Sequence, residues 1–425
     1  MSRRPRAVVV VTGSELVRGE RTDRNGPFLA AEALRRGLEP ARITIVGDAP
    51  AELEAALREG LEADACLVSG GLGPTHDDRT VELLARAAGL ELVVDEALER
   101  EIESISRMVA ERLRRPYADF APGVTKQATR PAPATSIGLA GTAPGLVLRA
   151  PTGCVVVMLP GPPGELRRLW GSALASEPVR ELLELARPPG RRVLRLHGVS
   201  ESAVARVLEE SGGDGEGVEV TICARDFEIH VDLVVEPGAE GRADALDAAL
   251  AERLEQWLFA RDERRVEELV LSLLRAQGLT VATAESCTGG MVAARLTDVA
   301  GSSESFVGGV VAYADDVKRS ELDVPEQLLA EHGAVSVEVA AAMAEGARRR
   351  LGADVAVAVT GVAGPDGGTP EKPVGRVHLH AAGPDGSLAR TLDFPGEREQ
   401  VRARATVTAL HLLRALLMGS RDESA

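Results

Sequence analysis

The residues best suited to chemistry lie in one short stretch, residues 283–290, which reads Thr-Ala-Glu-Ser-Cys-Thr-Gly-Gly. A short apolar run precedes it and a helical pattern follows it, so the stretch is predicted to turn from a buried strand into a helix. This turn would present the Ser286 hydroxyl and the Cys287 thiol beside unpaired backbone N–H groups, which attract anions at a helix N-terminus. The alternative is that Ser286 or Thr288 only caps the helix. Spacing alone does not distinguish an anion site from a capped helix.

A second candidate site lies at residues 70–79, which read Gly-Gly-Leu-Gly-Pro-Thr-His-Asp-Asp-Arg. The three glycines allow a ligand to approach the backbone closely, and Pro74 stiffens the turn. The adjacent carboxylates of Asp77 and Asp78 are predicted to stand at the start of a helix, where one of them is enough to cap it. The other could hold a hydrated Mg²⁺-like cation, which usually takes one or two carboxylates together with substrate phosphates.

Alternating strands and helices must position these N-terminal residues. The predicted strands are 7–11, 43–46 and 65–68, and the predicted helices are 25–36, 51–61 and 80–88. Such alternation indicates a parallel, doubly wound α/β sheet. Ligands bind beyond the carboxyl ends of the strands in these sheets. The loops that carry Glu15, Asp77 and Asp78 should lie at that edge.

Two further segments follow the N-terminal pattern. A Pro- and Arg-rich stretch at 167–192 marks a boundary, and a βαββα pattern over about 193–258 predicts a small α+β middle domain. This acidic segment has no Gly-x-x-Gly loop after its first helix, which favours a spacer and dimer contact over RNA binding. Strand and helix patterns then alternate again and predict a C-terminal α/β domain. The expected domains are therefore 1–170, 171–260 and 261–425.

Length and charge limit the class of protein. The 425 residues include 49 basic and 65 acidic side chains, which gives a net charge of −16, and 44% of them are hydrophobic. This composition is typical of a soluble globular protein of two or three domains, and the acidic balance argues against a general nucleic-acid binder. Four cysteines without paired spacing indicate reduced thiols and a cytoplasmic protein. No apolar run approaches the length of a membrane span, so none is expected.

The N-terminal motifs resemble those of the CinA family, whose first domain is related to the molybdopterin-binding proteins of molybdenum-cofactor synthesis. The matching segments run through the whole first domain and are residues 13–19, Asn25, 70–80, 126–128, 141–145 and 159–165. One departure is Gly138, where family members usually carry an Asn. A polar contact from that side chain to a ligand would be lost in this chain.

The resemblance implies a molybdopterin-binding-like fold that hydrolyses the pyrophosphate of ADP-ribose with the help of a metal. A glycine-rich backbone for phosphate and carboxylates for a metal suit such a site. The implied cofactor is a divalent metal ion, with Asp77 and Asp78 as its ligands. The implied substrate-binding residues are Glu15, Gly70, Gly71, Gly73 and Thr75.

The C-terminal motifs resemble the nicotinamide mononucleotide (NMN) deamidase domain of the CinA family. They are residues 284–290, Tyr313 with Lys318, 333–336 and 361–368. The resemblance implies deamidation of NMN without a cofactor, with Ser286 as the nucleophile. Tyr313 and Lys318 would assist proton transfer, and Thr360 would lie near the reacting group. The implied nucleotide-binding residues are Thr288, Gly289, Gly290, Gly361, Gly364, Arg398 and Arg402.

The identity of the base is open at this point. Amide hydrolysis needs a nucleophile, a base and donors for the oxyanion. Because no His lies in these motifs, Lys318 would have to serve, with a pKa lowered by burial and by a nearby Arg402. The alternative is that Lys318 merely pairs with substrate phosphate or with Asp315 or Asp316.

The nucleophile and the function also have alternative assignments. Cys287 competes with Ser286, since a helix N-terminus favours a thiolate. One rival function is a chain with a single active domain, in which Gly138 makes the first domain the one expected to be inactive. Another is a molybdopterin-binding protein without hydrolase activity. The expected partners are small nucleotides and a second copy of the chain, as a homodimer, with no membrane.

Overall fold

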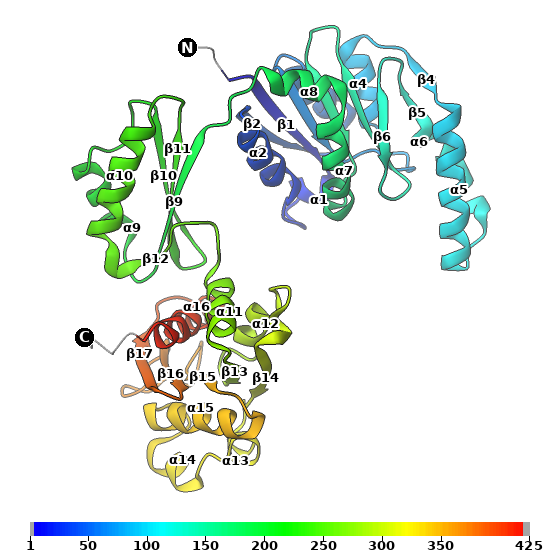
Figure 1. Cartoon of the computed structure of the whole chain (residues 1–425). Helices are drawn as coiled ribbons and strands as arrows, with labels where there is room; N and C mark the ends of the chain where they lie inside the picture. The colour runs from blue at the N-terminus through cyan, green and yellow to red at the C-terminus, as the bar shows by residue number, and fades with distance from the viewer. Residues whose placement is uncertain (1–3, 420–425) are drawn as a thin grey trace. The chain divides into compact units, whose positions relative to one another are not determined.

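The structure, a computed structural model, describes residues 4–419 of the chain. The chain divides into two compact units, Met1–Gly190 and Arg191–Ala425, which we treat separately (Figure 1). The division into three domains that we expected from the sequence stays a prediction. Within residues 4–419, no helix has the length and apolar character needed to cross a lipid bilayer.

The first unit is built on a six-stranded sheet with the order β2-β1-β3-β8-β7-β6. Neighbouring strands among β2, β1, β3 and β8 are parallel, whereas β7 and β6 pair antiparallel at the other end of the sheet. The predicted doubly wound sheet is therefore confirmed and extended by an antiparallel edge. The strands of this sheet are β1 (Arg6–Thr12), β2 (Glu39–Val46), β3 (Ala65–Ser69), β6 (Thr135–Leu139), β7 (Pro144–Arg149) and β8 (Val155–Leu159).

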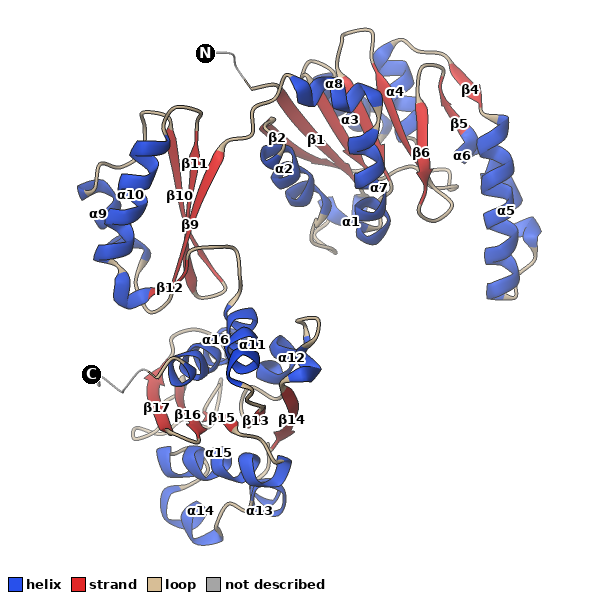
Figure 2. Ribbon diagram, in the orientation of Figure 1, coloured by secondary structure: helices blue, strands red, loops and turns tan. Residues whose placement is uncertain are grey.

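Helices cover both faces of this sheet (Figure 2). Successive side chains of a strand point to opposite faces. In β1, Val8 and Val10 pack with α3 and α4, while Val9 and Val11 pack with α2, α7 and α8. The helices of this layer arrangement are α1 (Ser14–Val17), α2 (Asn25–Arg35), α3 (Pro50–Gly60), α4 (Thr80–Ala88), α7 (Pro163–Ala175) and α8 (Glu177–Glu184).

A small helical appendage was not predicted from the sequence. The long helix α5 packs on α6 through Leu98, Ile102, Val124 and Ala128, beside a two-stranded ribbon. Its elements are β4 (Leu92–Val94), α5 (Glu96–Leu113), η1 (Tyr117–Asp119), α6 (Ala121–Ala128) and β5 (Thr129–Pro131). The appendage places Lys126 and Gln127 of α6 against the first unit's glycine-rich loop.

The second unit begins with a four-stranded sheet of order β10-β11-β9-β12, which α9 and α10 cover on one face (Figure 2). This confirms the predicted small α+β arrangement, to which the structure adds the strand β12. The elements are β9 (Gly190–Leu196), α9 (Glu201–Glu210), β10 (Val218–Arg225), β11 (Glu228–Val235), α10 (Glu240–Arg253), η2 (Glu255–Trp257) and β12 (Leu258–Ala260).

A five-stranded sheet of order β14-β13-β15-β16-β17 forms the rest of the second unit. The strands β14, β13 and β15 are parallel, and β16 and β17 continue the sheet antiparallel. The strands are β13 (Val281–Glu285), β14 (Phe306–Val311), β15 (Val355–Gly361), β16 (Arg376–Gly383) and β17 (Gly386–Asp393). The helices are α11 (Val266–Gln277), α12 (Met291–Thr297), η3 (Ser302–Glu304), α13 (Asp315–Leu322), α14 (Glu326–His332), α15 (Val337–Leu351) and α16 (Arg398–Leu417).

Side-chain size differs between the two faces of this sheet. The face that packs on α15 carries small side chains such as Ala282 and Ala284, and the opposite face carries valines such as Val281 and packs on α11 and α16. Small residues let a helix approach the strands closely, because buried side chains are close-packed. The strand β13, between β14 and β15, is buried on both faces.

A cluster of buried imidazoles lies within the second unit. His197, which follows β9, stacks on His411 of α16 with the ring centroids 3.8 Å apart. His411 Nε2 donates to the Glu228 carboxylate at 2.7 Å. Burial lowers the pKa of His197 to about 3 and also lowers the pKa of His411. Burial alone would raise the pKa of Glu228, but hydrogen bonds from His230 and His411 hold it at about 2.

This cluster predicts that acid destabilises the second unit. A histidine with a lowered pKa stays neutral in the folded chain, while the unfolded chain binds a proton below its pKa of about 6.5. Stability is therefore lost as the pH falls through 6.5, and for His197 the loss amounts to about 2 kcal/mol at pH 5. A His197→Phe variant keeps the ring stack and should lose less stability between pH 7.5 and pH 5 than the unchanged chain.

Urea unfolding followed by Trp257 fluorescence measures this difference, in a chain whose other tryptophan is replaced by Trp170→Phe. The backbone N–H of His197 donates to the Trp257 carbonyl at 2.9 Å, so this tryptophan reports on the cluster. His332→Gln is the matched control, because His332 is exposed and its replacement should not change the acid sensitivity. Equal losses in the His197→Phe variant and the unchanged chain would contradict the prediction.

Candidate functional site

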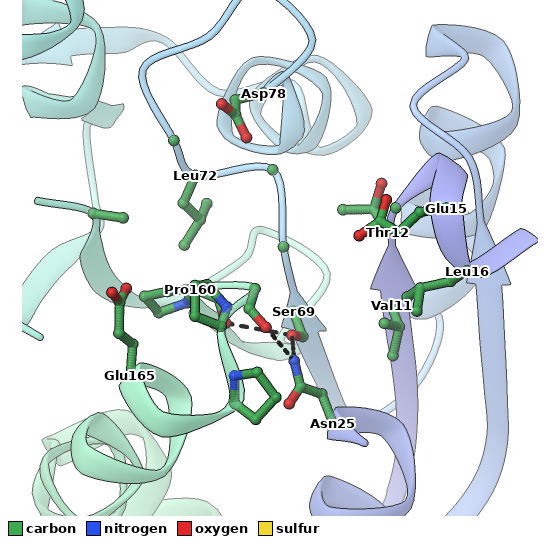
Figure 3. A pocket seen from close by; sticks show the side chains of 18 of the residues that line it. Val11, Thr12, Glu15, Leu16, Asn25, Ser69, Leu72, Asp78, Pro160 and Glu165 are labelled. Atoms are coloured by element: carbon green, nitrogen blue, oxygen red, sulfur yellow. Dashed lines mark hydrogen bonds between the residues drawn. The ribbon is translucent and has the colours of Figure 1, made fainter. Parts of the chain in front are cut away.

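A cavity of about 810 Å³ opens at the carboxyl ends of β1, β3 and β8 (Figure 3). The structure thereby brings together the loops that the sequence analysis singled out in the first unit. Thr75, which we also expected to bind substrate, is not among the lining residues. The predicted residues that do line the cavity are Glu15, Gly70, Gly71, Gly73, Asp77 and Asp78.

The glycine-rich loop after β3 follows a path that side chains would block. Gly70 has φ of +103° and Gly71 has φ of +66°. A Cβ at Gly70 would lie 2.5 Å from the Thr12 carbonyl oxygen, and one at Gly71 would overlap the Thr80 hydroxyl. Thr80, at the start of α4, donates its hydroxyl proton to the Gly70 carbonyl at 2.8 Å. The backbone of this loop is therefore fixed against the cavity wall.

Two buried amide side chains tie the loops around the cavity together. Asn25 Nδ2 donates to the Ser69 hydroxyl at 2.9 Å and to the Gly161 carbonyl at 2.7 Å. These bonds join the end of β3 to the loop after β8. The sequence identified Asn25 only as part of a family motif. The structure shows that its side chain connects these two segments.

Gln127 makes the second tie. Its Nε2 atom donates to the Leu72 carbonyl and to the Thr142 hydroxyl, both at 3.3 Å. Lys126 donates to the Thr75 carbonyl in the same loop. The appendage helix α6 thus holds the glycine-rich loop, which the sequence patterns did not reveal because the partners are more than fifty residues apart in the chain.

The Asp77 and Asp78 carboxylates do not cap α4, in contrast to one of our expectations. The helix begins at Thr80, and its N-cap residue Arg79 makes no side-chain cap hydrogen bond. The Asp78 carboxylate instead accepts hydrogen bonds from the Thr75 N–H at 2.9 Å and from the Thr75 hydroxyl. Asp78 therefore closes a turn over the cavity, and the pair faces the cavity rather than the helix.

The donor set of the cavity fits a hard divalent cation that also binds substrate phosphates. Among residues 4–419, no group of three or more His, Cys, Asp or Glu side chains is placed to hold a metal alone. A Mg²⁺-like ion needs only one or two carboxylates when phosphate oxygens and waters complete its shell. Asp77 and Asp78 meet that requirement. Gly138, the departure from the family pattern, lies in β6 and does not line the cavity.

The second candidate site lies at the carboxyl ends of β13, β14 and β15. Ser286, Tyr313 and Thr360 come from the ends of these three strands, which are neighbours in the sheet. The Ser286 N–H donates to the Val359 carbonyl at 2.9 Å, and the Ala312 N–H donates to the Glu285 carbonyl at 2.8 Å. Three of the four predicted catalytic residues are thus at one edge of one sheet, and the fourth, Lys318, lies in α13.

The Glu285 side chain binds the backbone N–H groups at the start of α12, which the sequence analysis expected to be unpaired. Its carboxylate accepts hydrogen bonds from the N–H groups of Gly290 at 2.9 Å, Val292 at 3.1 Å and Ala293 at 2.9 Å. The Glu285 side chain is 1% exposed. These N–H groups are therefore not free for an anionic ligand, as we had expected them to be, because the buried Glu285 carboxylate already accepts from them. Neither Ser286 nor Thr288 caps this helix.

The Cys287 thiol is not the thiolate that we considered. Burial raises the pKa of Cys287 to about 11, and its nearby backbone N–H groups and Arg402 counteract only part of this effect. The residue is 5% exposed, against 9% for Ser286. At neutral pH the thiol therefore stays protonated and buried.

Two arginines one turn apart on α16 hold the loops of this site. Arg402 donates from Nε to the Cys287 carbonyl at 3.0 Å and from Nη2 to the Thr288 carbonyl at 2.9 Å. Arg398 donates to the Gly364 carbonyl and to the Tyr313 hydroxyl, both at 2.8 Å. The two side chains connect three of the sequence motifs. Gly289 and Gly290 continue the first loop, Gly361 is the last residue of β15, and Gly364 lies in the loop after it.

Lys318 lies in α13 with its side chain 1% exposed. Its Nζ atom donates to the Tyr313 carbonyl at 3.1 Å and to the Asp315 carboxylate at 3.2 Å. Arg402 donates instead to the loop at Cys287 and Thr288, and within residues 4–419 it makes no hydrogen bond to Lys318. The alternative that Lys318 pairs with Asp315 is therefore observed.

Thr360, the last of the predicted catalytic residues, is fully buried in β15. Its hydroxyl donates to the Ala334 carbonyl at 2.8 Å. Ser336 in the same loop caps α15, where its Oγ accepts from the Val339 N–H at 3.3 Å. Thr360 thus ties the loop before α15 to the site edge, and its hydroxyl proton is already engaged.

Comparison with known families gives two matches that together cover most of the chain. The family described as "Probable molybdopterin binding domain" matches residues 8–178, and the family "CinA C-terminal domain" matches residues 263–417. A "CinA-like protein" of Mycobacterium sp. (strain MCS) is 45% identical over 423 residues, which cover 97% of this chain and 99% of that protein. The "CinA-like protein" of Mycobacterium tuberculosis (strain ATCC 25177 / H37Ra) is 43% identical over 426 residues, covering 97% and 98%.

Solved structures with similar segments include a competence/damage inducible protein from Agrobacterium tumefaciens. It is 43% identical and covers 37% of this chain and 99% of its own, with a TM-score of 0.35. A structure of MogA is 23% identical and covers 43% of this chain and 99% of its own, with a TM-score of 0.29.

Proposed function

This chain belongs to the CinA family, and we propose that it is a hydrolase of pyridine nucleotides with two separate sites. The site at the end of β13, β14 and β15 would convert NMN and water to nicotinate mononucleotide and ammonia. The cavity of the first unit would hydrolyse the pyrophosphate of ADP-ribose. The observation that carries the first assignment is the Ser286 hydroxyl, on a loop fixed by Glu285 and Arg402 and next to the strand that leads to Tyr313.

The proposed deamidation follows the general course of acyl transfer by a serine. The Ser286 oxygen adds to the carboxamide carbon while its proton passes to a base, and the base gives this proton to the nitrogen as the C–N bond breaks and ammonia leaves. Water hydrolyses the resulting ester and returns the serine. The backbone N–H groups of Cys287 and Thr288 are the candidate donors to the oxyanion.

Tyr313 is the group that we propose for the proton transfer from Ser286. Arg398 donates a hydrogen bond to its hydroxyl oxygen, which supports the negative charge that forms when the phenol loses its proton. Arg398 and Arg402 would also offer their remaining N–H groups to the nucleotide phosphate.

The choice of nucleophile gives a direct prediction. Ser286→Ala should abolish ammonia release from NMN, because it removes the attacking oxygen. Cys287→Ala should keep most of the activity, since its thiol is protonated at neutral pH. Initial rates of ammonia release, measured on both variants at matched thermal stability, test the assignment. The reverse result would make Cys287 the nucleophile.

The role of Lys318 gives a second prediction. The ion pair with Asp315 and the bond to the Tyr313 carbonyl favour a positioning role over the proton transfer suggested by the family resemblance. Lys318→Arg keeps a cation for both acceptors and should retain NMN turnover within about tenfold, with an unchanged pH profile. Arginine stays protonated, so a base role predicts near-complete loss in this variant.

Two controls make the Lys318 measurement interpretable. Circular dichroism and a melting curve establish that the larger guanidinium is accommodated in the buried site. Asp315→Asn removes only the ion pair and should give a mild loss with the same pH profile. A folded but inactive Lys318→Arg chain would return Lys318 to the proton-transfer role.

Support for a pyrophosphatase in the first unit comes from the cavity itself. Its floor is the glycine-rich loop, whose backbone can approach phosphate closely. Carboxylates of Asp77 and Asp78 would hold a divalent cation, which when bound neutralises charge on the phosphates. Without such an ion, the carboxylates around the cavity would repel a pyrophosphate.

Metal dependence is the corresponding prediction. ADP-ribose hydrolysis should require Mg²⁺ or Mn²⁺ and stop in excess chelator. Asp78→Asn should weaken the hydrolysis or its metal dependence and leave NMN turnover unchanged, because the other site lies in the second unit. Full ADP-ribose hydrolysis in chelator would contradict the metal assignment. Turnover of NMN alone would support the rival function with a single active domain. Binding of molybdopterin without hydrolysis of either nucleotide would support the rival function of a molybdopterin-binding protein.

A further inference from the structure

The cavity of the first unit is lined by six carboxylates, and they differ in how many hydrogen bonds they already accept. Asp23 accepts from the N–H groups of Asn25 at 2.8 Å and of Gly26 at 3.1 Å. A carboxylate engaged in this way already uses its lone pairs to accept hydrogen bonds from the protein. Asp23 is therefore occupied in starting the helix α2.

Asp48 is occupied in a similar way. It accepts from the Ser14 N–H at 3.0 Å, from the Ser14 hydroxyl at 2.6 Å and from the Thr12 hydroxyl at 3.1 Å. Asp78 accepts from the N–H and the hydroxyl of Thr75, and the pKa of its neighbour Asp77 is lowered by hydrogen bonding to Thr75 and to the backbone. Four of the six carboxylates thus have built-in donors.

Glu15 and Glu165 are the two of these carboxylates that accept no hydrogen bond from another group within residues 4–419. The Glu15 carboxylate folds over its own loop, where a Cβ at Gly13 would lie 3.0 Å from it. Glu165 lies in the first turn of α7, and Figure 3 shows it on a different element from Glu15 and Asp78. A Cβ at Gly141 would lie 2.6 Å from its Oε1 atom, so this glycine leaves room for the carboxylate.

The surroundings of Glu165 set it apart from the other cavity carboxylates. Burial raises its pKa, and the nearby Arg168 of its own helix offsets only part of that effect. A carboxylate at a helix N-terminus is normally stabilised in its charged form, so a raised pKa there is informative. A raised pKa brings a carboxylate closer to the operating pH, which is what general base catalysis requires.

We propose that Glu165 is the general base that activates water for pyrophosphate hydrolysis in this cavity. The inference rests on the proposed ADP-ribose activity. The water oxygen forms a bond to one phosphorus atom while Glu165 takes a proton from that water. The bond between the attacked phosphorus and the bridging oxygen breaks, and its electron pair leaves with the other phosphate. The products are AMP and ribose 5-phosphate.

This assignment divides the cavity carboxylates by role. The residues with built-in donors hold the loops or face the cation, whereas Glu165 keeps free lone pairs for a proton. Glu15 also lines the cavity with free lone pairs, from α1 directly after β1, and it is the natural comparison. The other charged groups around the cavity are Arg21 and Arg24, which come from the loop before α2.

The test is steady-state hydrolysis of ADP-ribose with Mg²⁺ by the full chain and its variants. Glu165→Gln removes the proton acceptor and keeps the size of the side chain, so kcat should fall by about 10² to 10⁴ with KM little changed. Glu184→Gln is the matched control, because Glu184 is an exposed carboxylate at the end of α8. NMN turnover, measured on the same preparations, should be unchanged in both variants.

Two further readouts separate a base from a merely structural residue. The rate of the unchanged chain should fall at low pH as Glu165 becomes protonated, and this acid limb should be absent from the residual activity of Glu165→Gln. Glu165→Ala should be partly rescued by formate, which can supply a carboxylate in the space vacated. Loss of activity with the acid limb intact and without rescue would mean that Glu165 only supports the fold.

The outcomes also separate this inference from the function on which it rests. If the unchanged chain fails to hydrolyse ADP-ribose with Mg²⁺ or Mn²⁺, the proposed pyrophosphatase and the role of Glu165 both fall. If the unchanged chain is active and Glu165→Gln keeps near-normal kcat, only the base assignment is overturned. Loss of activity in Glu15→Gln together with near-normal Glu165→Gln would transfer the role to Glu15.

Discussion

The buried carboxylate of Glu285 is the constraint on which the C-terminal site depends. A charged group that is 1% exposed is costly unless hydrogen bonds replace its lost water. The three N–H groups at the start of α12 provide this compensation, and they can do so only if the chain turns back through Gly289 and Gly290. The loop that carries Ser286 is thus fixed by an interaction that does not involve Ser286 itself.

In the first unit, neutral amide side chains and not a carboxylate fix the loops of the site. Asn25 and Gln127 are buried, and each donates to two acceptors on loops that come from different parts of the chain. Loops at the edge of a parallel sheet have no strand partners, so side chains must satisfy their carbonyl groups. In both units the sheet supplies a rigid platform, and a few polar side chains fix the loops above it.

The repeating patterns of the sequence were sufficient to predict the central strands and many helices. The run 7–11 and the helix 80–88 are local patterns, and both appear in the structure with bounds within one residue of the prediction. The antiparallel strands β6, β7 and β17 were not predicted, nor was the helix α5. Their pairing and packing depend on contacts between distant residues, which no local pattern specifies.

The candidate sites were predicted as sets of residues but not as sets of interactions. The sequence motifs located Ser286, Tyr313 and Thr360, and the parallel order of β13, β14 and β15 explains why they converge. Burial and hydrogen-bond partners could not be inferred in the same way. The raised pKa of Cys287 and the cap formed by Glu285 both depend on what surrounds the loop in space.

Each candidate site is assembled wholly within one compact unit. The cavity carboxylates and the amide ties belong to residues before Gly190, and the loops held by Arg398 and Arg402 belong to residues after it. Among residues 4–419, the hydrophobic clusters beneath the two sites share no residues. Substitutions that share no partners have additive effects on free energy. Each activity can therefore serve as the internal control for the other in a single preparation of the chain.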